Sequence, residues 1–275
     1  MRIKEAFPEM FERAYPAIDP TTPIISILPL LQFYEIDALP LSFDLNEKQR
    51  GIYGFSCLAR ILTLEPGRFK RFLEKPCEEV SEPLATVRAE QHLSVLLNVF
   101  LRKRFGFARV VERRGAGALV TLSDVLVLYG RGGVKSSLSL EDVASPAFSM
   151  PAEATIREAL KEMFSRRIRR VFVGESREYV WDRSIIEHIF SPAVLARVAQ
   201  NASEDILDIP ISAIRTSAAT EVRGGMKLKD AAAALNTQSG KCLVFDGKVV
   251  TPWDVIMKPW KAKELKIRQS KRSIR

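Results

Sequence analysis

The chain has 275 residues, of which 47% are hydrophobic and 27% are charged. That composition is typical of a folded globular protein and excludes a wholly disordered chain or a collagen-like fibre. The length exceeds what one hydrophobic core usually holds and fits two compact units. The formal net charge is +9, so nucleic acid and other phosphate-bearing partners have to be considered.

Cysteine usage and hydropathy indicate a cytoplasmic protein. Cys57, Cys77 and Cys242 are far apart and form no CxxC pair, so neither a disulfide framework nor a zinc ribbon is expected. The N-terminus carries acidic residues where a signal peptide needs an apolar stretch. The longest apolar run, residues 23–33, is much shorter than the roughly 20 residues of a spanning helix, so no membrane segment is expected.

One pattern of helices and strands occurs four times along the chain. Each copy begins with a short extended stretch and an amphipathic helix, continues with two strand-like runs, and ends with a second helix. The first helices contain Ile27, Leu93, Ile156 and Leu228, and the extended stretches are residues 24–27, 84–87, 147–150 and 217–220. The strand-like runs are ALPLSF and GIYGFS, FARVV and ALVTL, RRVFV and YVW, and KCLVF and KVV. The repeat is therefore βαββα, and the fold class is α/β (α+β).

The repeats are too small to be stable separately. At about 60–70 residues each has little core of its own, so we expect the four to pack as two pairs. The Gly/Ser-rich segment YGRGGVKSSLS, residues 129–139, predicts a boundary near the middle of the chain.

Two segments resemble the CBS-domain family, whose tandem pairs form Bateman modules. They are ASPAFSMPAEATIREALKEMFSRRIRRVFV and DGKVVTPWDVI. The resemblance covers nearly the whole chain and is closest in the third and fourth repeats. It implies a stand-alone protein of four CBS units packed as two Bateman modules. The first predicted domain is 1–132, with units at about 18–66 and 80–130. A linker at 133–139 leads to the second domain, 140–258, with units at about 140–195 and 205–258. A basic tail follows at 259–275.

A Thr-x-x-Asp motif occurs where a strand passes directly into a helix, in the second and the fourth repeat. A hydroxyl and free backbone N–H groups at a helix N-terminus suit phosphate oxygens, and a carboxylate one turn along can accept from ribose hydroxyls. The CBS resemblance implies these roles for Thr121, Asp124, Thr251 and Asp254. The same spacing is also a helix-capping pattern, which needs no ligand, so both interpretations stay open.

The first and third repeats depart from this motif. Aligning the first repeat puts Cys57 and Arg60 at the Thr and Asp positions, and the third has Trp181 and Ser184 there. Neither repeat has a carboxylate at the ribose position, and the arginine of the first repeat has no acceptor at all. We therefore expect one usable pocket in each pair of repeats, and so two in the chain.

The CBS resemblance implies an adenine nucleotide as the ligand, and it also predicts where the adenine base lies. It implies that the base rests on the strand before the motif and on the extended stretch of the same repeat. The predicted contacts are Thr86, Ala108, Arg109 and Val110 in the second repeat, and Thr220, Cys242, Leu243 and Val244 in the fourth. The alternative for these residues is an ordinary role in the sheet core.

The positive charge concentrates at one end of the chain. Residues 258–275 contain eight Lys/Arg and one Glu, so the rest of the chain is nearly neutral. A solvated tail is the simplest interpretation, and nucleic-acid or protein binding through the tail is the alternative. The clusters Arg102–Arg104 and Arg166–Arg170 close the first helices of two repeats, where cations complement the helix C-terminus.

No motif for catalysis or metal binding is present. His92 and His188 belong to no HExxH pattern, and neither a Walker loop nor a GxSxG elbow occurs. Together with this absence, the CBS resemblance implies a regulatory protein without catalytic activity that binds AMP, ADP or ATP in preference to S-adenosylmethionine. It leaves open a homodimer and an unidentified protein partner.

Overall fold

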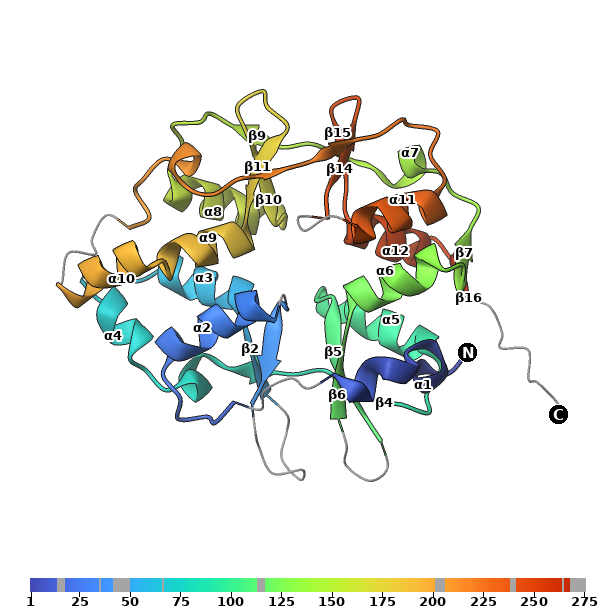
Figure 1. Ribbon diagram of the computed structural model, residues 1–275, viewed down its shortest axis with the longest axis horizontal. Coiled ribbons are helices and arrows are strands. Elements are labelled where there is room, and N and C mark those ends of the chain that lie inside the picture. Colours follow the sequence, from blue (N-terminus) through green and yellow to red (C-terminus); the bar gives the residue numbers. More distant parts are fainter. Residues whose placement is uncertain are drawn as a thin grey trace. The chain divides into compact units, whose positions relative to one another are not determined.

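The computed structural model divides the chain into two compact units (Figure 1). It describes residues 1–13, 18–34, 36–41, 50–65, 67–112, 117–200, 206–237, 241–263 and 265–267. The first unit combines Met1–Tyr15, Leu84–Ala147 and Ala219–Arg275, and the second combines Pro16–Pro83 and Phe148–Ala218. Each unit therefore contains one repeat from each half of the chain. The first unit holds the second and fourth repeats, and the second unit holds the first and third repeats. The pairing of consecutive repeats as Bateman modules stays a prediction.

The first unit contains the second and fourth repeats and the N-terminal segment. Its elements are α1 (Ile3–Ala6), η1 (Pro8–Glu12), β4 (Thr86–Arg88), α5 (Leu93–Lys103), β5 (Phe107–Val111), β6 (Gly117–Thr121), α6 (Leu122–Gly130), β7 (Val134–Ser136), α7 (Leu140–Val143), β8 (Ser145–Pro146), β13 (Thr220–Glu221), α11 (Leu228–Asn236), β14 (Leu243–Phe245), β15 (Lys248–Val250), α12 (Pro252–Lys261) and β16 (Leu265–Ile267). The strands form the sheets β4-β5-β6, β13-β14-β15-β8 and β16-β7.

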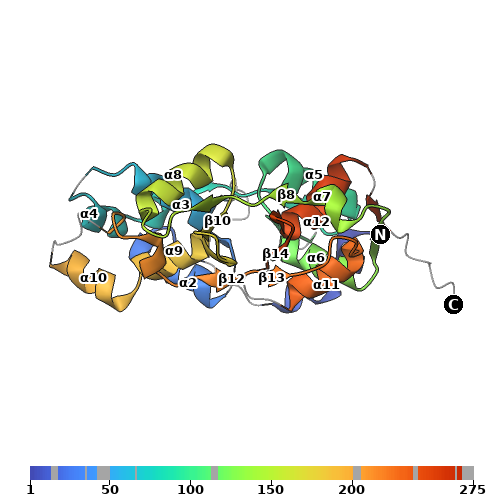
Figure 2. The same cartoon turned by 90° about the horizontal axis from the view of Figure 1, so that it is seen from above.

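One hydrophobic core holds the first unit together. Helices α6, α11 and α12 pack against one another (Figures 1 and 2). The predicted helical spacing is confirmed, because its apolar positions are the buried ones: Leu93, Leu96, Leu97 and Phe100 in α5, and Leu228, Ala231, Ala232 and Leu235 in α11. Burying a leucine or phenylalanine side chain stabilises the fold by about 1.5–3 kcal/mol before conformational entropy is counted.

The second unit contains the first and third repeats. Its elements are α2 (Ile24–Phe33), β1 (Ala38–Pro40), β2 (Arg50–Tyr53), α3 (Gly54–Leu62), α4 (Phe69–Leu73), η2 (Cys77–Val80), β3 (Glu82–Pro83), β9 (Ser149–Met150), α8 (Ile156–Arg166), β10 (Arg170–Val173), β11 (Glu178–Trp181), α9 (Asp182–Ile189), α10 (Pro192–Ala199), η3 (Ile211–Ala213) and β12 (Ser217–Ala218). The strands form the sheets β1-β2-β3 and β12-β11-β10-β9. No helix of the described residues is long and apolar enough to cross a bilayer.

The first repeat differs from its prediction. Residues 24–27 were expected to be extended, but they form the first turn of α2. Their apolar side chains continue the buried stripe of that helix, which includes Ile24, Ile27 and Leu28, so tertiary packing outweighs the strand preference of isoleucine. The extended contact that leads into this repeat is made by Ile18, which forms a parallel bridge to Leu41.

The predicted linker and part of the predicted tail belong to the fold. Strand β7 lies inside the linker 133–139, and it pairs with β16 from the tail. Helix α12 continues to Lys261, beyond the predicted domain end. Val134 and Ile267 explain why these segments pair, because the two residues face each other in the strand pair and contact the core of the first unit. Residues 268–275 lie outside the described part of the chain.

The pairing of β7 with β16 places two like charges opposite each other. Lys135 faces Lys266 in this register, and both side chains are exposed. Like charges directly opposite on neighbouring strands destabilise a sheet, whereas opposite charges contribute roughly 0.2–1 kcal/mol. A shift of the register by one residue would expose Val134, which is buried. The burial of Val134 therefore keeps the register even though the two lysines repel each other.

We expect Lys266→Glu to stabilise the protein, because it converts a repulsive cross-strand pair into an attractive one. The free energy of unfolding from urea titration should rise by about 0.5 kcal/mol at low salt, and the gain should shrink as salt is added. Lys263→Glu makes the same change of charge outside the strand pair and serves as the control. An equal gain in both variants would contradict the register.

Candidate functional site

The first Thr-x-x-Asp motif forms the junction between β6 and α6. Thr121 is the last residue of β6 and the N-cap of α6. Its backbone N–H and its hydroxyl both donate to Oδ2 of Asp124, at 2.7 and 2.8 Å. The Asp124 side chain is nearly buried, with 9% of its surface exposed. The cap thus ties the end of the strand to the first turn of the helix.

The second motif has the same geometry at the junction between β15 and α12. The backbone N–H and the hydroxyl of Thr251 donate to Oδ2 of Asp254, at 2.9 and 2.7 Å. Pro252 is the first residue of the helix, where its missing N–H costs no hydrogen bond. The capping interpretation is confirmed at both junctions, and both lie in the first unit.

Cations occupy the second oxygen of each carboxylate. The guanidinium of Arg13 donates to Oδ1 of Asp124. At the other junction, Nζ of Lys258 lies 2.9 Å from Oδ1 of Asp254, and the hydroxyl of Ser145 lies 3.3 Å from the same oxygen. Each aspartate therefore joins a helix cap to a positive charge.

A further cation lies at the start of α6. Nζ of Lys241, from the fourth repeat, donates to the hydroxyl of Ser123 at 2.6 Å. Ser123 lies between Thr121 and Asp124 in the first turn, where the helix dipole favours negative charge. Residues from the second and fourth repeats therefore meet at the first junction.

Strand alternation divides the predicted base contacts of the second repeat between two faces. Thr86 pairs with Arg109 across β4 and β5, and Arg109 pairs with Leu119 of β6, so these side chains share the face on which Thr121 lies. Ala108 and Val110 point to the opposite face and are buried in the core of the unit. The core interpretation is therefore confirmed for these two residues. Arg109 has no ion-pair partner among the described residues, and partial burial lowers its pKa.

The fourth repeat shows the same division. Leu243 pairs with Val250, and both are buried in the core of the unit. Val244 alternates with Leu243 and so faces the other side of the strand, whereas Cys242 directly precedes the strand and is fully buried. Thr220 is exposed beside this strand, and its backbone N–H donates to the carbonyl of Cys242 at 3.0 Å.

The junctions of the second unit lack the carboxylate cap. In the first repeat the expected alignment is wrong by one turn: Tyr53 is the N-cap of α3, so Ser56 takes the Asp position, and Cys57 and Arg60 lie further along the helix. Cys57 is buried, which raises its pKa to about 12. In the third repeat the predicted positions hold. Trp181 is the N-cap of α9, and its backbone N–H donates to Oγ of Ser184 at 2.9 Å.

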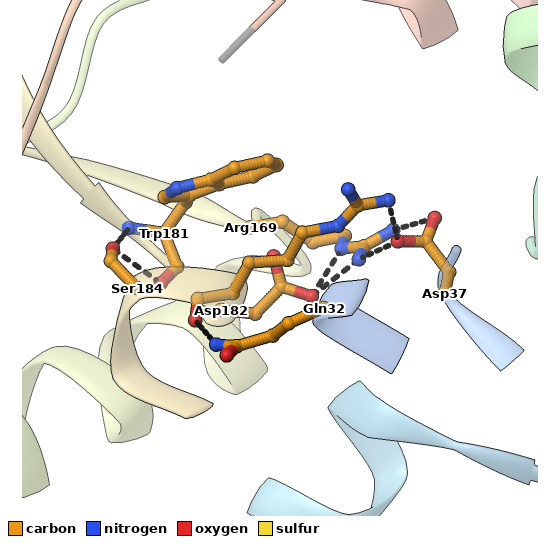
Figure 3. Close-up of polar contacts among 7 residues, drawn as sticks. Gln32, Asp37, Arg169, Trp181, Asp182 and Ser184 are labelled. Atoms are coloured by element: carbon orange, nitrogen blue, oxygen red, sulfur yellow. Dashed lines mark hydrogen bonds and ion pairs between the residues drawn. The ribbon is translucent and has the colours of Figure 1, made fainter. Parts of the chain in front are cut away.

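An ion-pair network lies beside α9, and sequence reasoning did not identify it (Figure 3). The guanidinium of Arg169 lies between two carboxylates, bonding both oxygens of Asp37 at 2.9 Å and Oδ2 of Asp182 through Nε, also at 2.9 Å. Arg183 adds a bond to Asp37 at 3.1 Å. Burial by itself would raise the pKa of Asp37, but the two arginines outweigh it and hold that pKa well below its usual range.

The network joins the first repeat to the third. Asp37 precedes β1, whereas Arg169 precedes β10 and Asp182 begins α9. Asp182 is 1% exposed, so its charge depends on Arg169 for compensation. The run of arginines at 166–170 was the available signal, but no sequence spacing indicates that one of them reaches residue 37.

Comparison with solved structures shows which fold this is. The protein MJ1225 of Methanocaldococcus jannaschii, proposed as an archaeal homologue of g-AMPK, matches 94% of this chain and 99% of its own with a TM-score of 0.79 at 17% sequence identity. The chain has the fold of the tandem CBS-domain proteins. The expected resemblance is thereby confirmed at the level of fold.

Shorter CBS-domain proteins match about half of the chain. CBSX2, in a complex with AMP, covers 41% of this chain and 84% of its own at 20% identity, with a TM-score of 0.33. PAE2072 from Pyrobaculum aerophilum, also complexed with AMP, covers 45% and 89% at 16% identity, with a TM-score of 0.35. No family model matches the sequence, and no curated protein matches it. Among the described residues, no group of His, Cys, Asp and Glu is arranged to hold a metal ion.

We expect Arg169→Ala to destabilise the protein by about 3 kcal/mol, because it leaves the buried Asp182 without a counter-charge. The midpoint of urea unfolding should fall accordingly. Arg215→Ala, which breaks the exposed pair with Glu187, is the control and should change stability by less than about 1 kcal/mol. Equal effects in the two variants would show that the network contributes no more than a surface ion pair.

Proposed function

We propose that this protein is a non-catalytic regulator that binds AMP, ADP or ATP at the two Thr-Asp junctions of its first unit. The observation that carries the proposal is the pair of nearly buried caps, Thr121–Asp124 and Thr251–Asp254, each at a point where a strand enters a helix directly. Two other capping boxes, at Thr155–Glu158 and Ser139–Asp142, have the same local hydrogen bonds on exposed surfaces. Burial and the position beside a sheet distinguish the candidate sites from ordinary caps.

The helix start and the cations suit the phosphate end of the ligand. Phosphate oxygens accept from N–H and hydroxyl donors at a helix N-terminus, where the dipole favours negative charge. At the first junction Thr121 and Ser123 provide hydroxyls, and Lys241 is bonded to Ser123. Arg109 lies on the same sheet face as Thr121 and carries a charge that no described acid neutralises. Phosphate recognition is therefore local, in agreement with the nearly neutral body of the protein.

The carboxylates suit the ribose. An ionised aspartate is an acceptor with two oxygens, and the two hydroxyls of a ribose are donors. In both caps Oδ2 holds the strand end, so Oδ1 is the oxygen that would receive the sugar. We assign the ribose contact to Asp124 at the first junction and to Asp254 at the second.

We propose that the adenine base packs against sheet residues whose side chains point away from the core of the first unit. At the first junction these include Thr86 and Arg109, and at the second they include Val244; Cys242 is fully buried, so we assign it a backbone contact. A mainly apolar wall with few polar groups is typical of nucleotide pockets. Ala108, Val110 and Leu243 point into the core, so we assign them backbone contacts to the base at most.

The second unit has a different role. Its two junctions carry Ser56 and Ser184 where a ribose would need a carboxylate, and the arginines beside α9 are engaged by Asp37 and Asp182. We therefore propose two nucleotide sites in the chain and a structural role for the second unit. Three buried cysteines without a disulfide fit a cytoplasmic location. A homodimer or a separate protein partner would receive the signal.

Calorimetric titration of the purified protein with AMP, ATP and S-adenosylmethionine tests the proposal. We expect adenine nucleotides to fill two sites, and Asp254→Ala to abolish one of them by removing an acceptor that a charged hydrogen bond requires. Asp142→Ala removes an equivalent cap carboxylate in the same unit, bonded to Ser139 at 2.7 Å, and should leave both sites intact. Absence of binding by every nucleotide, or equal loss in the two variants, would reject the proposed sites.

A further inference from the structure

The two candidate sites differ in where their cation comes from. At the second junction Lys258 lies one turn after Asp254 on the same helix, so the ion pair is local to α12. At the first junction Arg13 is 111 residues away from Asp124 in sequence. A separate segment therefore delivers the charge that occupies Oδ1 of Asp124.

Backbone hydrogen bonds and buried side chains hold that segment in place. The N–H of Ile3 donates to the carbonyl of Gln91 at 2.9 Å, and the N–H of Lys4 donates to the carbonyl of Ala89 at 3.1 Å. Ile3, Phe7 and Met10 are buried in the core of the first unit. Helix η1 then packs against β6, the strand that ends at Thr121. Arg13 follows η1 directly, so the anchored segment positions its guanidinium at the junction.

Arg13 occupies the oxygen that the proposed ribose contact requires. The capping bonds from Thr121 already use Oδ2 of Asp124, so the guanidinium and a sugar hydroxyl meet at the same oxygen, Oδ1. The guanidinium brings a full positive charge to the nearly buried carboxylate, whereas a sugar hydroxyl brings none, so the hydroxyl replaces Arg13 at a cost. The arginine side chain is 47% exposed, which leaves it room to withdraw into solvent.

We propose that Arg13 is an internal competitor for the nucleotide at the first site, which lowers the affinity of that site and links its occupancy to the N-terminal segment. This inference rests on the proposed function. Binding of nucleotide displaces the guanidinium from Asp124, and the end of η1 loses the ion pair that fastens it to the junction. At the second site the competing cation, Lys258, belongs to the same helix as Asp254, so only occupancy of the first site changes the N-terminal segment, which a partner can recognise.

Titration of Arg13→Ala in an Asp254→Ala background measures the first site by itself. Removing the competitor should tighten AMP binding about fivefold, the change expected from an ion pair of about 1 kcal/mol. Arg13→Lys keeps a cation at this position and should bind close to the background affinity. Lys4→Ala removes an exposed cation from the same segment and should have no effect. Unchanged or weaker binding in Arg13→Ala would overturn the inference, and weaker binding would make Arg13 a phosphate ligand.

Hydrogen exchange gives a readout that affinity does not. In the wild-type protein AMP should accelerate exchange of the Met10 amide, which donates to the carbonyl of Phe7 at 3.2 Å. The acceleration should be absent in Arg13→Ala, where the ion pair is already lost. Slower exchange on binding would overturn the inference. Absence of AMP binding in every variant, the Asp254→Ala background and the wild type included, would instead be a failure of the proposed function.

Discussion

The abrupt passage from strand to helix is the constraint on which the rest of the structure depends. The second helix of each repeat follows its strand with no loop between them. Helices α3, α6 and α9 begin at the residue after their strands, and only Thr251 separates β15 from α12. A helix that starts without a loop has backbone N–H groups with no intrahelical partner, and nearby side chains or ligands have to satisfy them. The residue at the third helical position therefore carries much of the chemistry of each repeat.

The chain meets this constraint with a carboxylate at both junctions of the first unit and with a hydroxyl at α9 of the second. Asp124 and Asp254 bring a negative charge to a nearly buried position, and each charge is balanced by a cation. Ser184 makes the corresponding bond to Trp181 without a charge. In the third repeat the carboxylate occurs two residues earlier, at Asp182, where it binds Arg169 and becomes part of the packing between repeats. A shift of two positions thus changes a candidate ligand site into a structural ion pair.

The local pattern predicted much of the fold and the identity of the cap residues. The apolar spacing of α5, α8 and α11 survives because the same side chains form the core. Residues 24–27 were mistaken for a strand because their β-branched side chains prefer extended backbone, whereas burial along α2 decides their conformation. Arg13 and Arg169 could not be assigned from sequence. Their partners are 111 and 132 residues away, and only the tertiary fold brings them together.

The double use of the cap aspartates explains how a binding event could reach the rest of the first unit. A ligand shifts a conformational equilibrium only by the difference in its affinity for the two states. Asp124 contacts the end of β6 through Oδ2 and the N-terminal segment through Oδ1, so any group that takes Oδ1 acts on that segment and leaves the cap in place. Asp254 contacts Lys258 of its own helix and Ser145 of β8, and Lys258 also donates to the carbonyl of Val143 at the end of α7. The two sites are thus alike in their caps but differ in the segment that each cation reaches, which allows one ligand to have two distinct structural effects.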